Sequence, residues 1–261
     1  MNLDKFYTNP NLIENLFKQI PQGDCYLEPS AGEGAFSDYA TKLGVCLAYD
    51  ILPGKTGMTQ ADFLKTDITD ALAGYKNVVC IGNPPFGRQA SLAVKFFNKC
   101  ASYPQIQSIC MIFPKSFKKV SVQNRLNLSF HLVSQQGMGD TAFLYEGKPY
   151  DVPTVFQVWE RRSKKREKIT TEALTPPLSY TRTPKKGDIS IRRVGYYAGK
   201  ANTFQNQSKQ SHYFITGSKD ADSLIEYLNG IEWGYDDTVG PRSISKQQLN
   251  PILNRHNPIN L

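Results

Sequence analysis

Residues 78–87 read VVCIGNPPFG, an apolar run that ends in glycine, asparagine and two prolines. A short, continuous apolar run is typical of a strand that is covered on both faces, as in a parallel sheet under helices. Pro84 and Pro85 have no N–H donor and a fixed φ angle, so the strand must end before them. Ligands of open α/β sheets bind at this carboxyl end of the strands. The stretch therefore predicts a buried strand that leads into either a binding site or a simple turn.

The first 160 residues alternate strand-like and helix-like segments, which favours a doubly wound, mostly parallel α/β sheet. Apolar residues recur at helical spacing in three segments, which are 10–20, 36–43 and 92–101. The expected strands are 25–29, 46–51, 78–82, 108–114, 131–135, 141–145 and 154–160. No helix separates the last two strands, so we expect them to form an antiparallel edge hairpin.

Charge divides the chain at about residue 160. Residues 1–160 contain 14 basic and 14 acidic residues, whereas 161–261 contain 17 basic and 9 acidic residues, which is the whole net charge of +8. A neutral body with a basic appendage is typical of polyanion binding, although a basic run is often only a solvated face. We expect a catalytic domain at 1–160, a basic, proline-rich linker at 161–187 and a small basic α+β domain at 188–261.

The composition favours a folded protein of a reducing compartment. Hydrophobic residues make up 40% of the chain, and its five cysteines have no CxxC spacing. No apolar run approaches the roughly 18 residues of a membrane span, and the amino terminus does not read as a signal peptide. The three histidines lack metal-ligand spacing. We therefore expect a cytoplasmic protein without a membrane segment or a metal.

A glycine-rich turn follows the first expected strand, in LEPSAGEGAF (27–36). Such a turn lets the backbone approach a ligand. Glu28 stands just before this turn, and Asp50 ends the next strand, where a carboxylate is suited to binding a ribose diol. An acidic group at the turn suits a cationic amino or sulfonium group better than a pyrophosphate.

Five segments in order, DKFYTNP, LEPSAGEGAF, AYDI, ADFL and NPPF, resemble the motifs of S-adenosylmethionine-dependent amino-methyltransferases of the N6-adenine type. The resemblance covers about residues 4–160. It implies the seven-stranded, Rossmann-like methyltransferase fold and S-adenosyl-L-methionine as cofactor. The residues it implies for the cofactor are Phe6, Tyr7, Thr8, Glu28, Ala31, Gly32, Gly34, Asp50, Ile51, Asp62 and Phe63. Those it implies for catalysis are Asn83, Pro84, Pro85 and Phe86.

The resemblance gives the tetrapeptide a chemical role. The exocyclic amine of adenine is a poor nucleophile because its lone pair is delocalised into the ring. If the Asn83 side-chain oxygen and the Pro84 carbonyl accept its hydrogen bonds, they favour the pyramidal nitrogen that attacks the sulfonium methyl. Phe86 offers a flat face for the target base.

Two other nucleotide sites fail on spacing. Gly54-Lys55-Thr56 resembles the end of a phosphate-binding loop, but Tyr49 stands where that loop needs its first glycine. The turn at 32–34 lacks the third glycine of the dinucleotide pattern, since residue 37 is serine. A dehydrogenase is thus kept only as an alternative.

The substrate is expected to be nucleic acid, with DNA favoured because the extra domain follows the catalytic motif. RNA stays open, since NPPF also occurs in RNA N6-adenine methyltransferases. The candidate nucleic-acid-binding residues are Lys115, Arg192, Arg193, Tyr196, Tyr197 and Lys200. Two further hypotheses are a non-catalytic nucleic-acid-binding module with this fold and methylation of a protein glutamine, where tyrosine is the usual residue in place of Phe86.

Overall fold

A computed structural model describes residues 7–8, 10–139, 143–145, 148–150, 152–234 and 241–256. Its contacts divide the chain into two compact units, Met1–Lys168 (unit 1) and Ile169–Leu261 (unit 2). Each unit has its own sheet and its own hydrophobic core.

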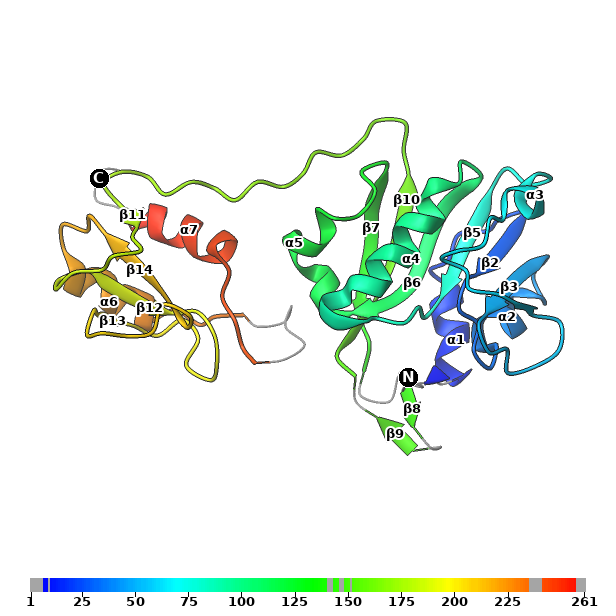
Figure 1. The fold of residues 1–261 in the computed structure, drawn as a ribbon, viewed down its shortest axis with the longest axis horizontal. Helices are drawn as coiled ribbons and strands as arrows, with labels where there is room; N and C mark the ends of the chain where they lie inside the picture. Colours follow the sequence, from blue (N-terminus) through cyan, green and yellow to red (C-terminus); the bar gives the residue numbers. More distant parts are fainter. Residues whose placement is uncertain are drawn as a thin grey trace. The chain divides into compact units, whose positions relative to one another are not determined.

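Unit 1 is built on a seven-stranded sheet with the strand order β4-β3-β2-β5-β6-β10-β7 (Figure 1). Every neighbouring pair is parallel except those of β10, which runs antiparallel to both β6 and β7. The strands are β2 (Cys25–Glu28), β3 (Cys46–Asp50), β4 (Thr59–Gln60), β5 (Val78–Gly82), β6 (Ile106–Pro114), β7 (Phe130–Gly137) and β10 (Thr154–Arg161). The mostly parallel, seven-stranded, Rossmann-like sheet predicted from the sequence is confirmed.

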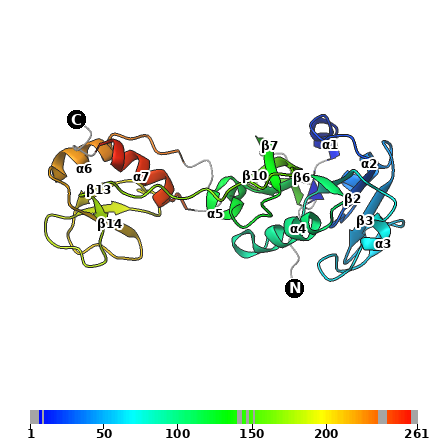
Figure 2. The ribbon, with the colours of Figure 1, turned by 90° about the horizontal axis from the view of Figure 1, so that it is seen from above.

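Helices cover both faces of this sheet, as Figure 2 shows for α1 and α4. They are α1 (Pro10–Phe17), α2 (Ala35–Ala40), α3 (Thr69–Leu72), η1 (Arg88–Ala90), α4 (Ser91–Ser102), η2 (Lys115–Lys118) and α5 (Val120–Gln123). Two cores result: one includes Phe97 of α4, and the other includes Leu16 of α1 and Phe36 of α2. All five residues of β5 are buried, as its apolar sequence predicts.

The antiparallel edge is formed by other strands than expected. β10 pairs with β7, in a register that places Gln157 opposite Gln135. The expected partner segment, 141–145, contributes β8 (Phe143–Tyr145) to a separate sheet with β1 (Tyr7–Thr8) and β9 (Lys148–Tyr150). The prediction paired two strands that are close in sequence. The structure differs because β7 continues in the main sheet to Gly137, and the strands between β7 and β10 belong to the separate sheet.

Unit 2 is a small α+β domain, as predicted. Its antiparallel sheet has the order β11-β14-β12-β13, and two helices supply much of its core through Leu224, Leu228, Leu249 and Leu253. The elements are β11 (Ser179–Tyr180), β12 (Ile189–Arg192), β13 (Ala201–Thr203), β14 (His212–Thr216), α6 (Ala221–Asn229) and α7 (Lys246–Arg255). Ser245 begins α7 with a reciprocal capping box.

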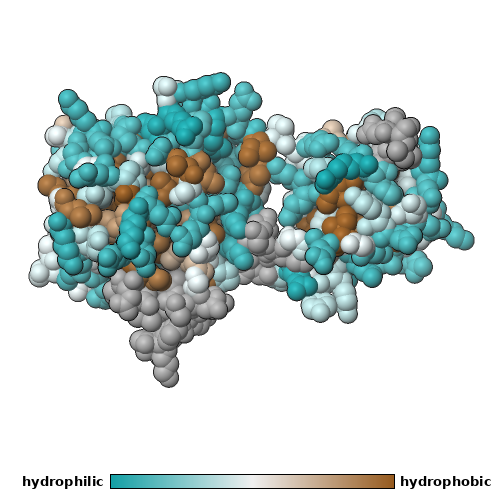
Figure 3. Space-filling model, turned by 180° about the vertical axis from the view of Figure 1, so that it is seen from behind, coloured by the Kyte–Doolittle hydropathy of each residue, from teal (hydrophilic) through white to brown (hydrophobic). Residues whose placement is uncertain are grey.

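The surface is mostly hydrophilic on the face displayed in Figure 3, with apolar residues gathered in limited patches. Among the described residues, no helix has the length and hydrophobicity needed to cross a bilayer. The same part of the chain contains no group of three or more His, Cys, Asp or Glu side chains arranged for a metal ion.

Candidate functional site

Parallel pairing brings the carboxyl ends of β3, β2 and β5 to one edge of the sheet. Glu28 pairs with Ala48 of β3, and Leu27 pairs with Cys80 of β5. Glu28, Asp50 and Gly82, which end these three strands, therefore lie at the same edge. This is the position at which open α/β sheets bind their ligands.

The glycine turn after β2 is held by backbone hydrogen bonds. The Ala31 N–H donates to the Tyr49 carbonyl at 2.9 Å, and the Gly34 N–H donates to the Ala31 carbonyl at 2.7 Å. Gly32 and Gly34 have φ angles of 52° and 85°, which glycine adopts without steric cost. The turn thus presents its backbone where the sequence predicted a cofactor loop.

Asp50 is oriented by two backbone donors. Its Oδ2 atom accepts a hydrogen bond from the Gly32 N–H at 2.7 Å, and its Oδ1 atom accepts one from the Leu52 N–H at 2.8 Å. An ionised carboxylate has about four acceptor positions, so Asp50 can still bind a pair of hydroxyl groups. Ile51 beside it is 52% exposed, and its side chain is available to pack on a flat ligand.

Glu28 is an acid in a buried position. It is 2% exposed, and its Oε2 atom accepts a hydrogen bond from the Ser37 N–H at 2.7 Å. Burial raises the pKa of Glu28 to about 8, against the opposing effects of the Ser37 hydrogen bonds and the charge of Lys55. A β-carbon at Gly82 would lie 3.2 Å from the Glu28 Cγ atom. Glu28 therefore lies close beside the chain directly before Asn83.

The NPPF segment is fixed to its surroundings at both ends. The Ser30 hydroxyl donates to the Asn83 carbonyl at 3.4 Å, which joins the segment to the glycine turn. The Phe86 carbonyl accepts hydrogen bonds from two N–H groups of α4, at Leu92 and Ala93. Pro84 is buried, while Asn83, Pro85 and Phe86 are half-buried. Hydrogen bonds therefore hold both ends of the loop in place.

The remaining predicted cofactor residues are Asp62, Phe63, Phe6, Tyr7 and Thr8. Asp62 follows β4, and its carboxylate accepts from the Leu64 N–H at 3.1 Å and pairs with Lys65. Phe63 is 1% exposed and stacks on Phe96 in the core, so only its backbone can face a ligand. Phe6 lies outside the described residues. Tyr7 and Thr8 form β1, but their side chains are not among the described ones.

One contact at the site was missed from the sequence. The segment after β3 folds back over the glycine turn: the Gly54 N–H donates to the Gly32 carbonyl at 2.9 Å, and Lys55 pairs with Asp38 of α2. A β-carbon at Gly34 would meet the Lys55 side chain at 2.5 Å. Only turns separate this lysine from β4, which agrees with the rejection of a phosphate-binding loop. No local pattern signals these contacts, because they join residues about 20 positions apart.

In unit 2, five of the predicted nucleic-acid-binding residues lie in or beside one loop, between β12 and β13. Tyr196 and Tyr197 are 74% and 63% exposed, and Lys200 is also exposed. Arg192 and Arg193 are partly used in the fold, since they donate to the carbonyls of Val194 and Gln210. Lys115 belongs to unit 1, where it begins η2.

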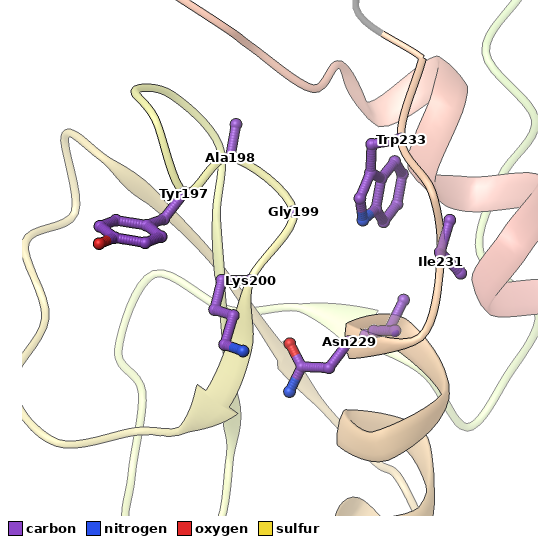
Figure 4. A pocket seen from close by; sticks show the side chains of 8 residues that line it. Tyr197, Ala198, Gly199, Lys200, Asn229, Ile231 and Trp233 are labelled. Atoms are coloured by element: carbon purple, nitrogen blue, oxygen red, sulfur yellow. The ribbon is translucent and has the colours of Figure 1, made fainter.

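A cavity of about 160 Å³ adjoins this loop. Trp233 lies on its far side, opposite Gly199, and the Tyr197 ring points away from it (Figure 4). A β-carbon at Gly199 would lie 2.3 Å from the Trp233 Nε1 atom, so the indole packs directly on the loop backbone. The lining residues are Tyr197, Ala198, Gly199, Lys200, Leu228, Asn229, Ile231 and Trp233.

The chain matches no protein-family model and no curated protein sequence. Solved structures resemble it in backbone. The 23S rRNA methyltransferase ErmE aligns with 62% of this chain and 71% of its own, at 15% identity and a TM-score of 0.45. The tRNA m1G37 methyltransferase of M. jannaschii aligns with 63% of this chain and 51% of its own, at 16% identity and a TM-score of 0.41. A protein of the NADB-Rossmann superfamily from Streptococcus agalactiae aligns with 62% of this chain and 73% of its own, at 10% identity and a TM-score of 0.37.

Proposed function

We propose that the chain transfers a methyl group from S-adenosyl-L-methionine to the exocyclic N6 amine of adenine in nucleic acid. The observation that carries the proposal is the hydrogen bond from the Ser30 hydroxyl to the Asn83 carbonyl, at 3.4 Å. It joins the glycine turn to the NPPF segment at the carboxyl edge of the sheet. Transfer requires the methyl donor and the amine acceptor to be held close together, and these two segments are neighbours.

The residues at this edge fit the cofactor. Asp50 keeps free acceptor positions for the ribose hydroxyls, and exposed Ile51 can pack on the cofactor adenine. Gly32 and Gly34 let the turn adopt its positive φ angles, and the Lys55 side chain occupies the space beside Gly34. Glu28 can bind a cationic amino group, either directly or by way of the backbone of the glycine turn. S-adenosylmethionine, when bound, supplies an activated methyl group on a sulfonium sulfur.

The chain's own residues then act on the target amine. The Asn83 side-chain oxygen and the Pro84 carbonyl accept hydrogen bonds from the two N–H groups of the amine. The nitrogen lone pair is thereby directed out of the ring system and toward the methyl carbon. A bond forms from this nitrogen to the methyl carbon while the carbon–sulfur bond breaks, and the nitrogen releases one proton to solvent. Phe86 packs against the core and is only half-buried, so a base can stack on the exposed part of its ring.

The polymer is less sharply defined than the reaction. The preference for DNA came from the order of motifs alone, and no feature of the described residues favours it. The methyltransferases named above act on rRNA and tRNA by their own descriptions. RNA is therefore at least as suitable a substrate as DNA, and both belong in the test.

The direct test is methyl transfer from labelled S-adenosylmethionine to matched DNA and RNA pools, followed by digestion and mass spectrometry of the nucleosides. N6-methyladenine in either pool would support the reaction and identify the polymer. Transfer to another nucleoside, or to protein glutamine, would contradict the proposed specificity. Absence of transfer with cofactor bound would favour a non-catalytic binding module.

A further inference from the structure

The balanced charge of residues 1–160 conceals a separation along the chain. Residues 71–139 contain eight lysines and arginines and not one aspartate or glutamate. Residues 1–70 contain ten acidic and five basic residues. The dividing point lies just before β5, the strand that leads into the NPPF segment. The cofactor residues from Glu28 to Asp62 thus belong to the acidic part, and the catalytic loop opens the basic part.

Three of these basic residues come together at the carboxyl edge of the sheet. Arg88 begins η1, directly after the NPPF segment, and Lys115 begins η2, directly after β6. The two short helices are neighbours, because β5 and β6 lie side by side. Arg125 follows α5, and its Nη1 atom donates to the Gln89 carbonyl of η1 at 3.4 Å. Within the described part of the chain, none of the three forms an ion pair with a carboxylate.

The backbone of η1 is held in an unusual conformation at this place. Gln89 and Ala90 have φ angles of 52° and 59°, which are rarely adopted by residues other than glycine. Such strain persists only where surrounding contacts impose it, and it gathers at binding sites. Here the contacts are the Arg125 hydrogen bond and the attachment of Phe86 to α4. The result is an exposed Arg88 projected from a fixed backbone.

We propose that Arg88, Lys115 and Arg125 form a phosphate-binding surface on unit 1. This surface binds the nucleic-acid backbone on either side of the target base. The inference rests on the proposed function, since it assumes a nucleic-acid substrate. Lysine and arginine contacts to phosphates provide most of the sequence-independent affinity for nucleic acids. The charge separation suits the two ligands: a cationic cofactor binds at the acidic part, and a polyanion binds at the basic part.

This surface gives the catalytic unit its own affinity for the substrate. The excess charge of residues 161–261 then adds to the binding instead of supplying all of it. It also gives a reason for the absence of carboxylates from residue 71 to residue 139, since a carboxylate there would repel phosphates.

The test measures salt dependence of binding by the full-length protein, without cofactor. The variant Arg88→Gln/Lys115→Gln removes two charges from the surface. The matched control Lys76→Gln/Lys99→Gln removes two from the same acid-free region, at the opposite edge of the sheet before β5 and in the last turn of α4. The probes are fluorescent single-stranded and duplex oligonucleotides, in DNA and RNA versions. Circular dichroism and thermal melting establish that all variants are folded.

Each phosphate contact contributes roughly 0.7–0.9 to the slope of log K against log salt. We expect Arg88→Gln/Lys115→Gln to reduce the slope by about 1.4–1.8 and the control to leave it unchanged. The charge-preserving variant Arg88→Lys/Lys115→Arg should restore the wild-type slope. Equal losses in the surface variant and the control, an unchanged slope in the surface variant, or no salt-dependent binding by the wild type would each overturn the proposal.

Failure of this inference is distinguishable from failure of the proposed function. Binding is measured without cofactor, whereas methylation is measured with it. Methyl transfer that persists with an unchanged salt slope in Arg88→Gln/Lys115→Gln overturns the surface alone. A reduced slope in a protein that never methylates nucleic acid overturns the reaction alone.

Discussion

The Glu28 carboxylate accepts a 2.7 Å hydrogen bond from the backbone N–H of Ser37 while being almost fully buried. This bond ties the end of β2 to the first turn of α2, across the glycine turn. The same side chain lies close to Gly82, directly before the NPPF segment. A single acid therefore connects the cofactor turn, a helix and the proposed reaction centre.

Because burial raises the pKa of Glu28 to about 8, the folded state keeps a proton that the unfolded state releases near its ordinary pKa of 4.5. Stability should therefore fall as pH rises between those two values and level off above about pH 8. Glu28→Gln should flatten this dependence, while Glu33→Gln, at an exposed position, should keep it. The free energy of unfolding in urea at several pH values checks this expectation, and parallel curves for wild type and Glu28→Gln would contradict it.

A cationic group bound beside Glu28 lowers the pKa of the carboxyl, so cofactor binding near pH 7 should release a proton. Calorimetric titrations in buffers with different ionisation enthalpies measure that release. We expect it in the wild type and not in Glu28→Gln. Equal proton release by both proteins would show that the released proton comes from another group.

Asn83→Ala should remove an acceptor that acts on the amine during transfer. Preorganised hydrogen-bonding groups of this type contribute about 100- to 1,000-fold to the rate, so we expect a loss of at least that size in kcat. Cofactor affinity should change little, because the proposed role of Asn83 is toward the target amine and not toward the cofactor. Asn15→Ala, on the exposed surface of α1, is the matched control. Unchanged turnover in Asn83→Ala would exclude the mechanism.

The sheet was largely predictable because its determinants are local. The apolar run from Val78 to Ile81 and the prolines after it gave β5 and its end. Parallel pairing then required Glu28 and Asp50 to share an edge, whatever the details of packing. The positions of these residues therefore followed from strand order and from the positions of the strand ends.

What the sequence missed depends on contacts between distant residues. The closure of Lys55 over Gly34 and the burial of Phe63 under Phe96 are decided by how loops and helices pack. The pairing of β10 with β7 likewise skips a segment that is nearer in sequence. The charge separation was hidden for another reason: a total over 160 residues averages two opposite halves.

Asp50→Asn should weaken cofactor binding. The variant loses the negative charge, and hydrogen bonds to charged groups contribute about 1.5–3 kcal/mol, which corresponds to roughly a 10- to 100-fold rise in Kd. Asp70→Asn, on the exposed side of α3, should have no effect. Isothermal titration with S-adenosylmethionine measures both. A Kd within twofold of the wild type would mean that Asp50 only holds the turn through Gly32 and Leu52.

In unit 2, alanine substitutions at Gly199 and Gly187 distinguish the cost of backbone strain from the cost of a side-chain clash. Their φ angles are 93° and 97°, but a β-carbon at Gly199 would meet the Trp233 indole at 2.3 Å, whereas one at Gly187 would meet nothing within 4 Å. Gly187→Ala should cost only the left-handed conformation, about 1–2 kcal/mol.

Gly199→Ala should cost a further 1–3 kcal/mol, roughly the penalty for overpacking, because the rigid indole must move. Its tryptophan fluorescence should change, since Trp233 is displaced from the cavity wall, and nucleic-acid affinity should fall if this cavity belongs to the interface. Urea unfolding and fluorescence spectra of the two variants give the comparison. Equal destabilisation of both, with unchanged spectra, would mean that Trp233 is free to leave Gly199 and that the cavity has no fixed wall there.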